Sequence, residues 1–344
     1  MPLGIRRHFD DPALYGTSFR TETSSADLAL LTAEVRSAGG MVAIAHSEQD
    51  DLDWKVIAEH DVTAMEIYNF HANFIELYES GQLDKIFEME PFVGTVGETG
   101  DPDLAAIVML GSYPEPALEK WRRVSSTRSI TPIAGSDVHE NVILPGLCAF
   151  DLCAELAEEY PNMVAALSSE GPLMMPDGER LDSYGRVFRW VQNRPLIAPD
   201  ADPVVAVEEA INSGRNVVVF EIFGAAKGVD LVAMQGAEVL EMGSETTASS
   251  GATLWARTPA SPTPGRLASW TDGAAAVITG TIVRSHDGIS EVVASVTGPS
   301  SWIETPLDAP GSYHLEVIIQ PLHLIDALGS ASSYAQGNYR WVET

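Results

Sequence analysis

Residues 41–46 read MVAIAH, a short apolar run that ends in a histidine. Two later runs have the same character, VTAMEIYN at 62–69 and SITPIAGSD at 129–137. Each run is short, mostly apolar and bounded by turn or polar residues, a pattern typical of a strand that is buried on both faces. The sequence therefore predicts three buried strands in the first half of the chain.

Helical patterns separate the three runs. Leu28, Leu31 and Val35 recur at helical spacing before the first run, and Gly39 with the glycine after it ends that pattern. The stretch DLDWKVIAEH at 51–60 predicts a second helix, and further helical stretches fill much of the segment before the third run. Strands that alternate with helices predict a parallel sheet covered by helices, either open or closed into a barrel.

The pattern changes near residue 230. A last helix, PVVAVEEAINSG at 203–214, and a strand, RNVVVFEIFG at 215–224, precede the change. Short β-rich runs such as AAVITGTIVRS and GSYHLEVII follow it, with Gly, Pro and Ser between them, which is typical of a β-sandwich. We therefore predict two domains, an α/β domain over 1–230 and a β-sandwich over 231–344.

The chain is strongly acidic, with a formal charge of −29 at pH 7. Such a surface repels phosphate backbones and anionic lipids, so the sequence predicts no basic nucleic-acid surface. It also repels an anionic substrate unless bound cations reverse the sign locally. No apolar run in the sequence reaches the roughly 18 residues of a membrane span, and the first residues contain no signal-peptide core. We therefore expect a cytoplasmic chain or a piece of an exported parent, of undefined oligomeric state.

The chain has two cysteines, Cys148 and Cys153, too few for a disulfide framework or a cysteine-rich zinc site. We expect two buried thiols, although a bridge between them is compatible with an oxidising compartment. Thiolates therefore play no part in the metal site that the sequence predicts.

Polar side chains that can bind metals lie at or just beyond the carboxyl ends of the predicted strands. They are His46, Glu66, Asn69, His71, Asp137 and His139. In parallel α/β folds such side chains converge on one face, where active sites form. Imidazole and carboxylate together suit Zn²⁺, Mn²⁺ or Fe²⁺, so the sequence predicts a divalent-metal site there.

Three segments of the α/β region carry a more specific pattern: GGMVAIAHS at 39–47, TAMEIYN at 63–69 and IAGSDVHE at 133–140. In order and approximate spacing they resemble the PHP (polymerase and histidinol phosphatase) family, in which one strand ends in Ala-His-Pro, the next contains a glutamate and a later one ends in Gly-Ser-Asp-x-His. The resemblance implies an α/β fold, namely an incomplete, distorted (β/α)7 barrel of the PHP type over residues 1–230, followed by a C-terminal β-sandwich.

The resemblance also implies a chemistry. In that family the barrel holds several divalent metals, and a metal-activated water attacks phosphorus. Three residues are expected to bind the metal and carry catalysis: His46, Asp137 and His139. Glu66 is expected to bind the metal as well, or to orient a ligand as a buried carboxylate. Asn69 and His71 would either contact the substrate phosphate or only cap the following helix.

The chain departs from the family in two places. Family members begin with a strand ending in His-x-His, and nothing before His46 supplies that motif. Ser47 also stands where the family has proline. We therefore expect the first barrel strands to be missing and the metals to be fewer or absent, because of truncation, a late reading-frame start or degeneration; of these we favour truncation.

The predicted function is hydrolysis of a phosphorylated small molecule by a phosphoesterase that uses Mn, Fe or Zn. Two alternatives stay open. One is a non-catalytic scaffold whose sandwich binds carbohydrate, protein or cell envelope. The other is an amidohydrolase-like metal enzyme, since that barrel also places His and Asp at strand ends.

Overall fold

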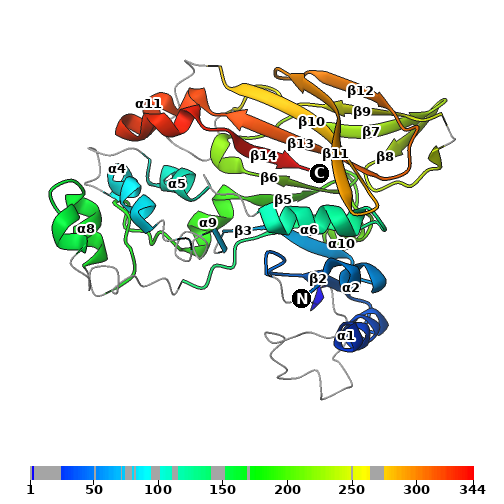
Figure 1. The fold of residues 1–344 in the computed structure, drawn as a ribbon, viewed down its shortest axis with the longest axis horizontal. Helices are drawn as coiled ribbons and strands as arrows, with labels where there is room; N and C mark the ends of the chain where they lie inside the picture. Colours follow the sequence, from blue (N-terminus) through cyan, green and yellow to red (C-terminus); the bar gives the residue numbers. More distant parts are fainter. Residues whose placement is uncertain are drawn as a thin grey trace.

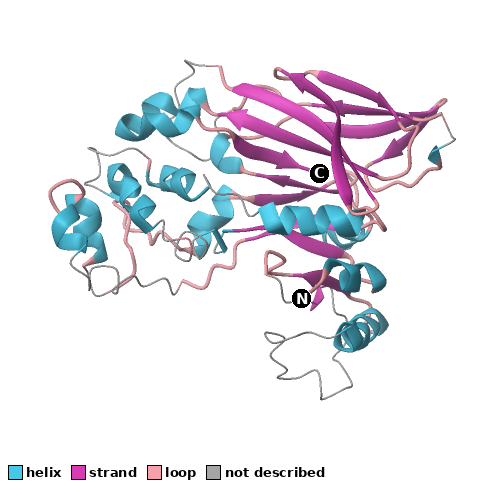
Figure 2. Ribbon diagram, viewed as in Figure 1, coloured by secondary structure: helices cyan, strands magenta, loops and turns pink. Residues whose placement is uncertain are grey.

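The protein is represented by a computed structural model, which describes residues 2–3, 25–49, 52–70, 72–73, 80, 83–93, 101–110, 115–140, 152–168, 171–248, 251–263 and 275–344. Figure 1 shows a parallel sheet with its helices in the lower part, and antiparallel strands stacked above it. Helices dominate the left and lower parts of the molecule, and strands dominate the upper right (Figure 2). No helix among the described residues is long and apolar enough to span a membrane.

The N-terminal region alternates helices with parallel strands. Its main elements are α1 (Ser25–Ser37), β2 (Met41–Ile44), α2 (Trp54–Glu59), β3 (Ala64–Asn69), η2 (Leu83–Met89), α4 (Glu90–Val93), η3 (Pro102–Ala105), α5 (Ala106–Leu110), α6 (Glu115–Ser125) and β4 (Thr131–Gly135). Strands β2, β3 and β4 are parallel, and the two-residue strand β1 (Pro2–Leu3) pairs antiparallel with β2. The three predicted strands and the helix before the first of them are therefore confirmed.

The parallel strands follow the order β2-β3-β4, and every residue of β3 is buried. Burial on both faces explains why these strands are continuous apolar runs without alternation. In the part of the chain that the structure describes, they form an open sheet and no closed barrel. A distorted barrel therefore stays a prediction.

The C-terminal region is a β-sandwich. Its elements and those that lead into it are α7 (Leu152–Leu156), α8 (Pro161–Leu167), α9 (Tyr184–Trp190), β5 (Gln192–Pro195), α10 (Pro203–Asn212), β6 (Asn216–Val219), η5 (Glu221–Phe223), β7 (Asp230–Gln235), β8 (Glu238–Glu241), β9 (Thr253–Arg257), β10 (Val277–His286), β11 (Ile289–Thr297), β12 (Trp302–Pro306), β13 (Ser312–Gln320), η7 (Leu322–Leu324), α11 (Ile325–Leu328), η8 (Gly329–Gln336) and β14 (Tyr339–Glu343). One sheet has the order β11-β10-β13-β14-β6-β5, and the other has the order β12-β9-β7-β8.

The two antiparallel sheets pack through alternate residues of their strands. Ile282 and Leu315 of the larger sheet and Leu254 and Ile303 of the smaller one are buried in a single apolar cluster. The residues between them in sequence point away from this core, as expected for stacked sheets. The predicted β-rich character of the C-terminal region follows from this alternation.

The larger sheet crosses the predicted boundary at residue 230. Strand β14 lies between β13 and β6, with Val342 opposite Val219 and Glu343 opposite Val218. Strands β5 and β6 come from the region expected to belong to the α/β domain, yet they complete the sandwich sheet. The two regions therefore share one sheet.

Two asparagine side chains join the parallel sheet to the sandwich. Asn193 on β5 accepts a hydrogen bond from Ala134 N at 2.9 Å and donates one to Ala134 O at 2.8 Å, as a neighbouring strand would. Asn216 on β6 is fully buried and donates to Pro132 O at 2.8 Å and to Asn193 Oδ1 at 3.1 Å. Strand β4 is thereby attached to the sandwich.

Helix α6 covers the outer face of the larger sheet through buried charges. Arg122 on the helix and Arg340 on β14 both donate to the carboxylate of Glu316 on β13. Next to them, the ring of Trp121 meets the ring of His314 edge-on, with centroids 4.8 Å apart. The paired charges and the ring contact fix the helix on the sheet.

Cys153 is buried and disulfide-bonded, so the prediction of a free thiol was wrong for this residue. Cys148 lies outside the described residues. A two-cysteine chain offers too weak a sequence pattern to separate a bridge from two thiols, because the outcome depends on the distance between the side chains.

We predict that Asn216→Asp lowers the free energy of unfolding by at least about 2 kcal/mol, because a buried carboxylate would face Pro132 O and Asn193 Oδ1 where the amide now donates. The control is Asn212→Asp, since exposed Asn212 only accepts from Arg36 Nη1, which an aspartate also does. Urea denaturation measures both variants. Equal effects would show that the amide of Asn216 does not stabilise the junction.

We also predict a pH dependence that originates at His323 in η7. Burial lowers the pKa of His323 to about 4, although the hydrogen bond to Phe223 O opposes this effect. The unfolded chain, with its ordinary pKa, binds the proton first as pH falls below about 6.5, so the folded state loses roughly 2 kcal/mol by about pH 4.5. In His323→Gln this loss should disappear from the urea-unfolding free energies measured over that range, and parallel curves for both proteins would contradict the prediction.

Candidate metal site

The candidate site lies beyond the carboxyl ends of β2 and β4. His46 Nε2 is 3.7 Å from Asp137 Oδ2, and His139 Nε2 is 2.8 Å from Asp137 Oδ1. The structure therefore places both imidazoles against the carboxylate of Asp137, although His46 lies far from Asp137 and His139 in the sequence. His46 and Asp137 converge because β2 and β4 are parallel neighbours of β3, so their carboxyl ends meet at one edge. Among the described residues of this site, the ligand atoms that all lie within 4.8 Å of one another belong to His46, Glu48 and Glu66.

Both chain segments turn sharply to reach this arrangement. His46 has φ 53° and Asp137 has φ 47°, in the left-handed region that non-glycine residues rarely adopt. Each such residue costs roughly 1 kcal/mol, and residues of this kind concentrate at functional sites. The turns redirect both side chains immediately after the strands, which places imidazole and carboxylate opposite each other.

Glu66 on the central strand β3 is buried, and its carboxylate connects the turn after β2 to the end of β3. Its Oε2 accepts from His46 N at 2.7 Å and from Asn69 Nδ2 at 3.1 Å. Burial raises the pKa of Glu66, while these hydrogen bonds oppose the rise. His46, Glu48 and Glu66 each offer an atom that lies within 4.8 Å of the others, so Glu66 is compatible with either predicted role, ligand or support.

Glu48 is a site residue that sequence reasoning missed. Its Oε1 is 3.3 Å from His46 Nδ1. The hydrogen bond with Glu48 raises the pKa of His46, an effect that burial opposes and that Asp137 and Glu66 reinforce. The sequence feature that could have revealed Glu48 is an acidic residue two positions after the histidine. The structure places it in a turn in which Gln49 N donates to His46 O. Several carboxylates therefore surround one imidazole, and their field favours a cation.

Ser47 stands at the position where the resemblance led us to expect proline. It is buried, and its hydroxyl donates to the backbone oxygen of Glu66. A proline at this position would have no such donor. The serine therefore ties the turn after β2 to β3, next to the carboxylate that holds His46.

Asn69 and His71 are the predicted substrate residues. The side chain of Asn69 is buried, its Oδ1 accepts from Ala72 N at 3.0 Å, and its Nδ2 lies 3.4 Å from His46 Nδ1 besides bonding Glu66. Asn69 thus caps the turn after β3 and supports the site from below, which favours the capping alternative for this residue. His71 lies outside the described residues.

A second group of potential ligands lies at the interface with α6 and consists of His314, Glu316 and Glu343. Arg340 donates to both carboxylates, and Arg122 donates to Glu316. Burial, reinforced by the nearby Glu316 charge, raises the pKa of Glu343 well above its ordinary value, and the guanidinium group of Arg340 opposes this rise. The two guanidinium groups already supply the positive charge here, so a metal ion is not required.

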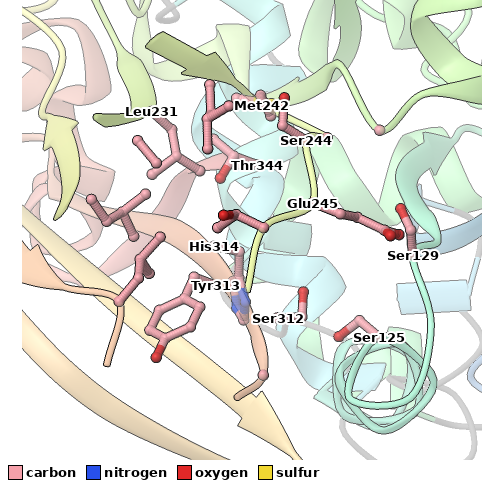
Figure 3. Close-up of a pocket in the computed structure, with 18 of the residues that line it drawn as sticks. Ser125, Ser129, Leu231, Met242, Ser244, Glu245, Ser312, Tyr313, His314 and Thr344 are labelled. Atoms are coloured by element: carbon pink, nitrogen blue, oxygen red, sulfur yellow. The ribbon is translucent and has the colours of Figure 1, made fainter. Parts of the chain in front are cut away.

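A cavity of about 420 Å³ lies between α6 and the sandwich, and residues such as Ser125, Tyr313 and Thr344 line it (Figure 3). None of the predicted site residues that the structure describes lines this cavity. The hydroxyl groups of Ser125 and Thr344 are already bonded to backbone groups of the protein. The cavity is therefore a weaker candidate for a functional site than the group of residues at the strand ends.

No protein-family model matches the sequence, and neither curated proteins nor solved structures include a significant match to it. The likeness to the PHP family is thus a likeness of three segments. What the chain does has to be argued from those segments and from the geometry of the site.

We predict that Gly135→Ala disturbs the site, because a Cβ on Gly135 would overlap Glu66 Oε1. The expected loss in unfolding free energy is about 2 kcal/mol, as for other overpacked positions. In a Glu66→Ala background the same substitution should cost less than about 1 kcal/mol, because the obstructing carboxylate is gone. Gly171→Ala serves as the control, since a Cβ there meets no atom within 4 Å. Equal costs in both backgrounds, by urea denaturation, would contradict this packing.

Proposed function

We propose that this protein is a divalent-metal-dependent hydrolase of phosphate esters. The observation that carries the proposal is the convergence of His46 and Asp137, 3.7 Å apart, with His139 2.8 Å from the other oxygen of the same carboxylate. Two imidazoles and a carboxylate at the carboxyl ends of parallel strands are a ligand set suited to Mn²⁺, Fe²⁺ or Zn²⁺.

The chemistry of the donor groups fits such an ion. His46, Asp137 and His139 would hold it, with Glu48 close enough to assist and Glu66 holding the backbone of His46. A bound divalent ion would lower the pKa of a water molecule and neutralise charge on phosphoryl oxygens. Two further residues position these ligands. Glu66 fixes the turn at His46, and Gly135, which has no side chain, allows Glu66 to approach β4.

The substrate that we propose is a phosphorylated small molecule. The side chain of His139 is 54% exposed, whereas that of Asp137 is 18% exposed, so the site opens to solvent on the His139 side. The formal charge of −29 opposes a long polyanion, while a bound cation would attract a single phosphate group locally. Both features favour a small ester over nucleic acid.

We predict that Asp137→Asn weakens divalent-ion binding at least tenfold and reduces p-nitrophenyl phosphate hydrolysis at least a hundredfold, because the amide lacks the carboxylate charge. A matched control exists in Asp287→Asn, since Asp287 has φ 48°, close to the 47° of Asp137, and its side chain is 98% exposed. Titration calorimetry with Mn²⁺ and Zn²⁺ and a steady-state assay measure the two effects.

The outcomes separate the competing functions. Metal binding without turnover of any phosphate ester would favour a scaffold, and turnover of a cyclic amide alone would favour an amidohydrolase-like enzyme. Unchanged metal affinity and turnover in Asp137→Asn would refute the assignment of this site.

A further inference from the structure

The outer face of the smaller sheet carries an unusual set of side chains. Trp302 and Glu304 on β12 and Trp255 and Arg257 on β9 point to the same side, because alternate residues of a strand share a face. We call these four residues the tryptophan face. In register, Trp302 lies opposite Arg257, and Glu304 lies opposite Trp255.

This face is directed away from the core. Ile303, Leu254 and Ala256, which alternate with the four residues, are buried between the two sheets. Trp302 is 48% exposed. In Figure 1, β12 and β9 lie in the upper right part of the molecule. Because Trp302 adjoins a second tryptophan, Trp255, on the same face, the two form a continuous apolar patch, and such patches rimmed by polar residues can mark binding surfaces.

The two rings and the guanidinium group contact one another. The Trp255 and Trp302 centroids are 6.3 Å apart, with their planes at 78°. The Arg257 guanidinium lies 5.6 Å from the Trp302 centroid. Such contacts restrain the rings and so reduce the entropy lost when a ligand binds.

Arg257 makes no ion pair with another described residue. Its Nε is buried without a hydrogen-bond partner, so the donors that could reach a surface ligand are the terminal nitrogens of the guanidinium group. The carboxylate of Glu304 is exposed on the neighbouring strand. The guanidinium group of Arg257 and the carboxylate of Glu304 therefore lie beside the two indole rings on the outer face of the sheet.

The ligand that matches this set has apolar ring faces edged by hydroxyl groups. The C–H face of a sugar ring can pack on an indole, and its hydroxyls can both accept from Arg257 and donate to Glu304. Nucleic-acid bases also stack on aromatic rings, but the charge of −29 repels their phosphates. The exposed Asp230, opposite Arg257 on β7, argues further against an anionic chain.

A protein partner fits less well. Stable protein interfaces bury about 800 Å² on each side and have cores depleted of charge. On the same outer face Val232 lies beside Trp255 and the exposed Val239 lies on β8, but charged residues interrupt this apolar surface: Glu304, Asp230 and Glu241. The charge distribution therefore favours a narrow polar chain.

We propose that the tryptophan face binds a neutral carbohydrate chain. Binding at this surface does not depend on metal chemistry at His46 and Asp137, so this proposal can be tested independently of the proposed hydrolase activity. It would attach the protein to a glycan-bearing material while the strand-end site remains free.

The experiment uses the full chain and native affinity electrophoresis in gels that contain soluble neutral polysaccharides, namely β-glucan, xylan, mannan and starch, with polygalacturonate as an anionic comparison. We expect retardation by at least one neutral polysaccharide and none by polygalacturonate. Trp302→Ala and Trp255→Ala should each weaken retardation at least tenfold in apparent Kd, and Trp302→Phe should retain most of it, because a stacking ring remains.

Phe188→Ala is the matched control, since Phe188 is an aromatic residue on α9 that is 55% exposed. It should leave retardation unchanged. Far-UV circular dichroism and thermal unfolding establish that the tryptophan variants are folded. Lack of retardation by every neutral polysaccharide, equal retardation of wild type and a folded Trp255→Ala/Trp302→Ala variant, or preferential retardation by polygalacturonate would each overturn the proposal.

Discussion

The geometry of the strand-end site depends on one buried carboxylate, that of Glu66. A carboxylate removed from water has to use its acceptor capacity within the protein. Glu66 does so by accepting from the backbone of His46 and from the side chain of Asn69, while its Oε1 lies directly over Gly135. One side chain on the central strand thus sets the distance to the turn after β2 and to the end of β4. The left-handed turns at His46 and Asp137 are tolerable because this packing leaves the chain few alternatives.

The second constraint is the junction between the parallel sheet and the sandwich. Asn193 pairs with the backbone of Ala134, and Asn216 holds both Pro132 and Asn193. Since Asp137 follows β4 by two residues, the sandwich helps to position the site even though it contributes no ligand to it. The charged cluster between α6 and β13 fixes the same two regions from the other side. The two regions are therefore better described as parts of one structure that share the larger antiparallel sheet than as two independent domains.

The sequence predicted features that depend on local pattern, and it did not predict those that depend on distant partners. Continuous apolar runs were sufficient to locate β2, β3 and β4, and the parallel order implied that His46, Asp137 and His139 would lie at one edge. Glu48 was missed because a single acid in an acidic loop has no periodic signal. The membership of β5 and β6 in the sandwich sheet was missed because β14, which joins β6 to that sheet, lies more than a hundred residues later. Asn193 and Asn216 were missed for the same reason, since a polar residue in a strand gives no indication of which backbone it will meet.

The position of β14 has a consequence for how the chain is made. Residues 339–343 are inserted between β13 and β6, so β6 lacks a neighbour on that side until almost all of the described chain has left the ribosome. Until then its edge can pair with other nascent chains, which is a hazard for slowly completed sheets. The shared sheet can accordingly be completed only after residue 343 has been synthesised, and a ribosome stalled after residue 320 would present a substrate for chaperones instead of a finished sheet.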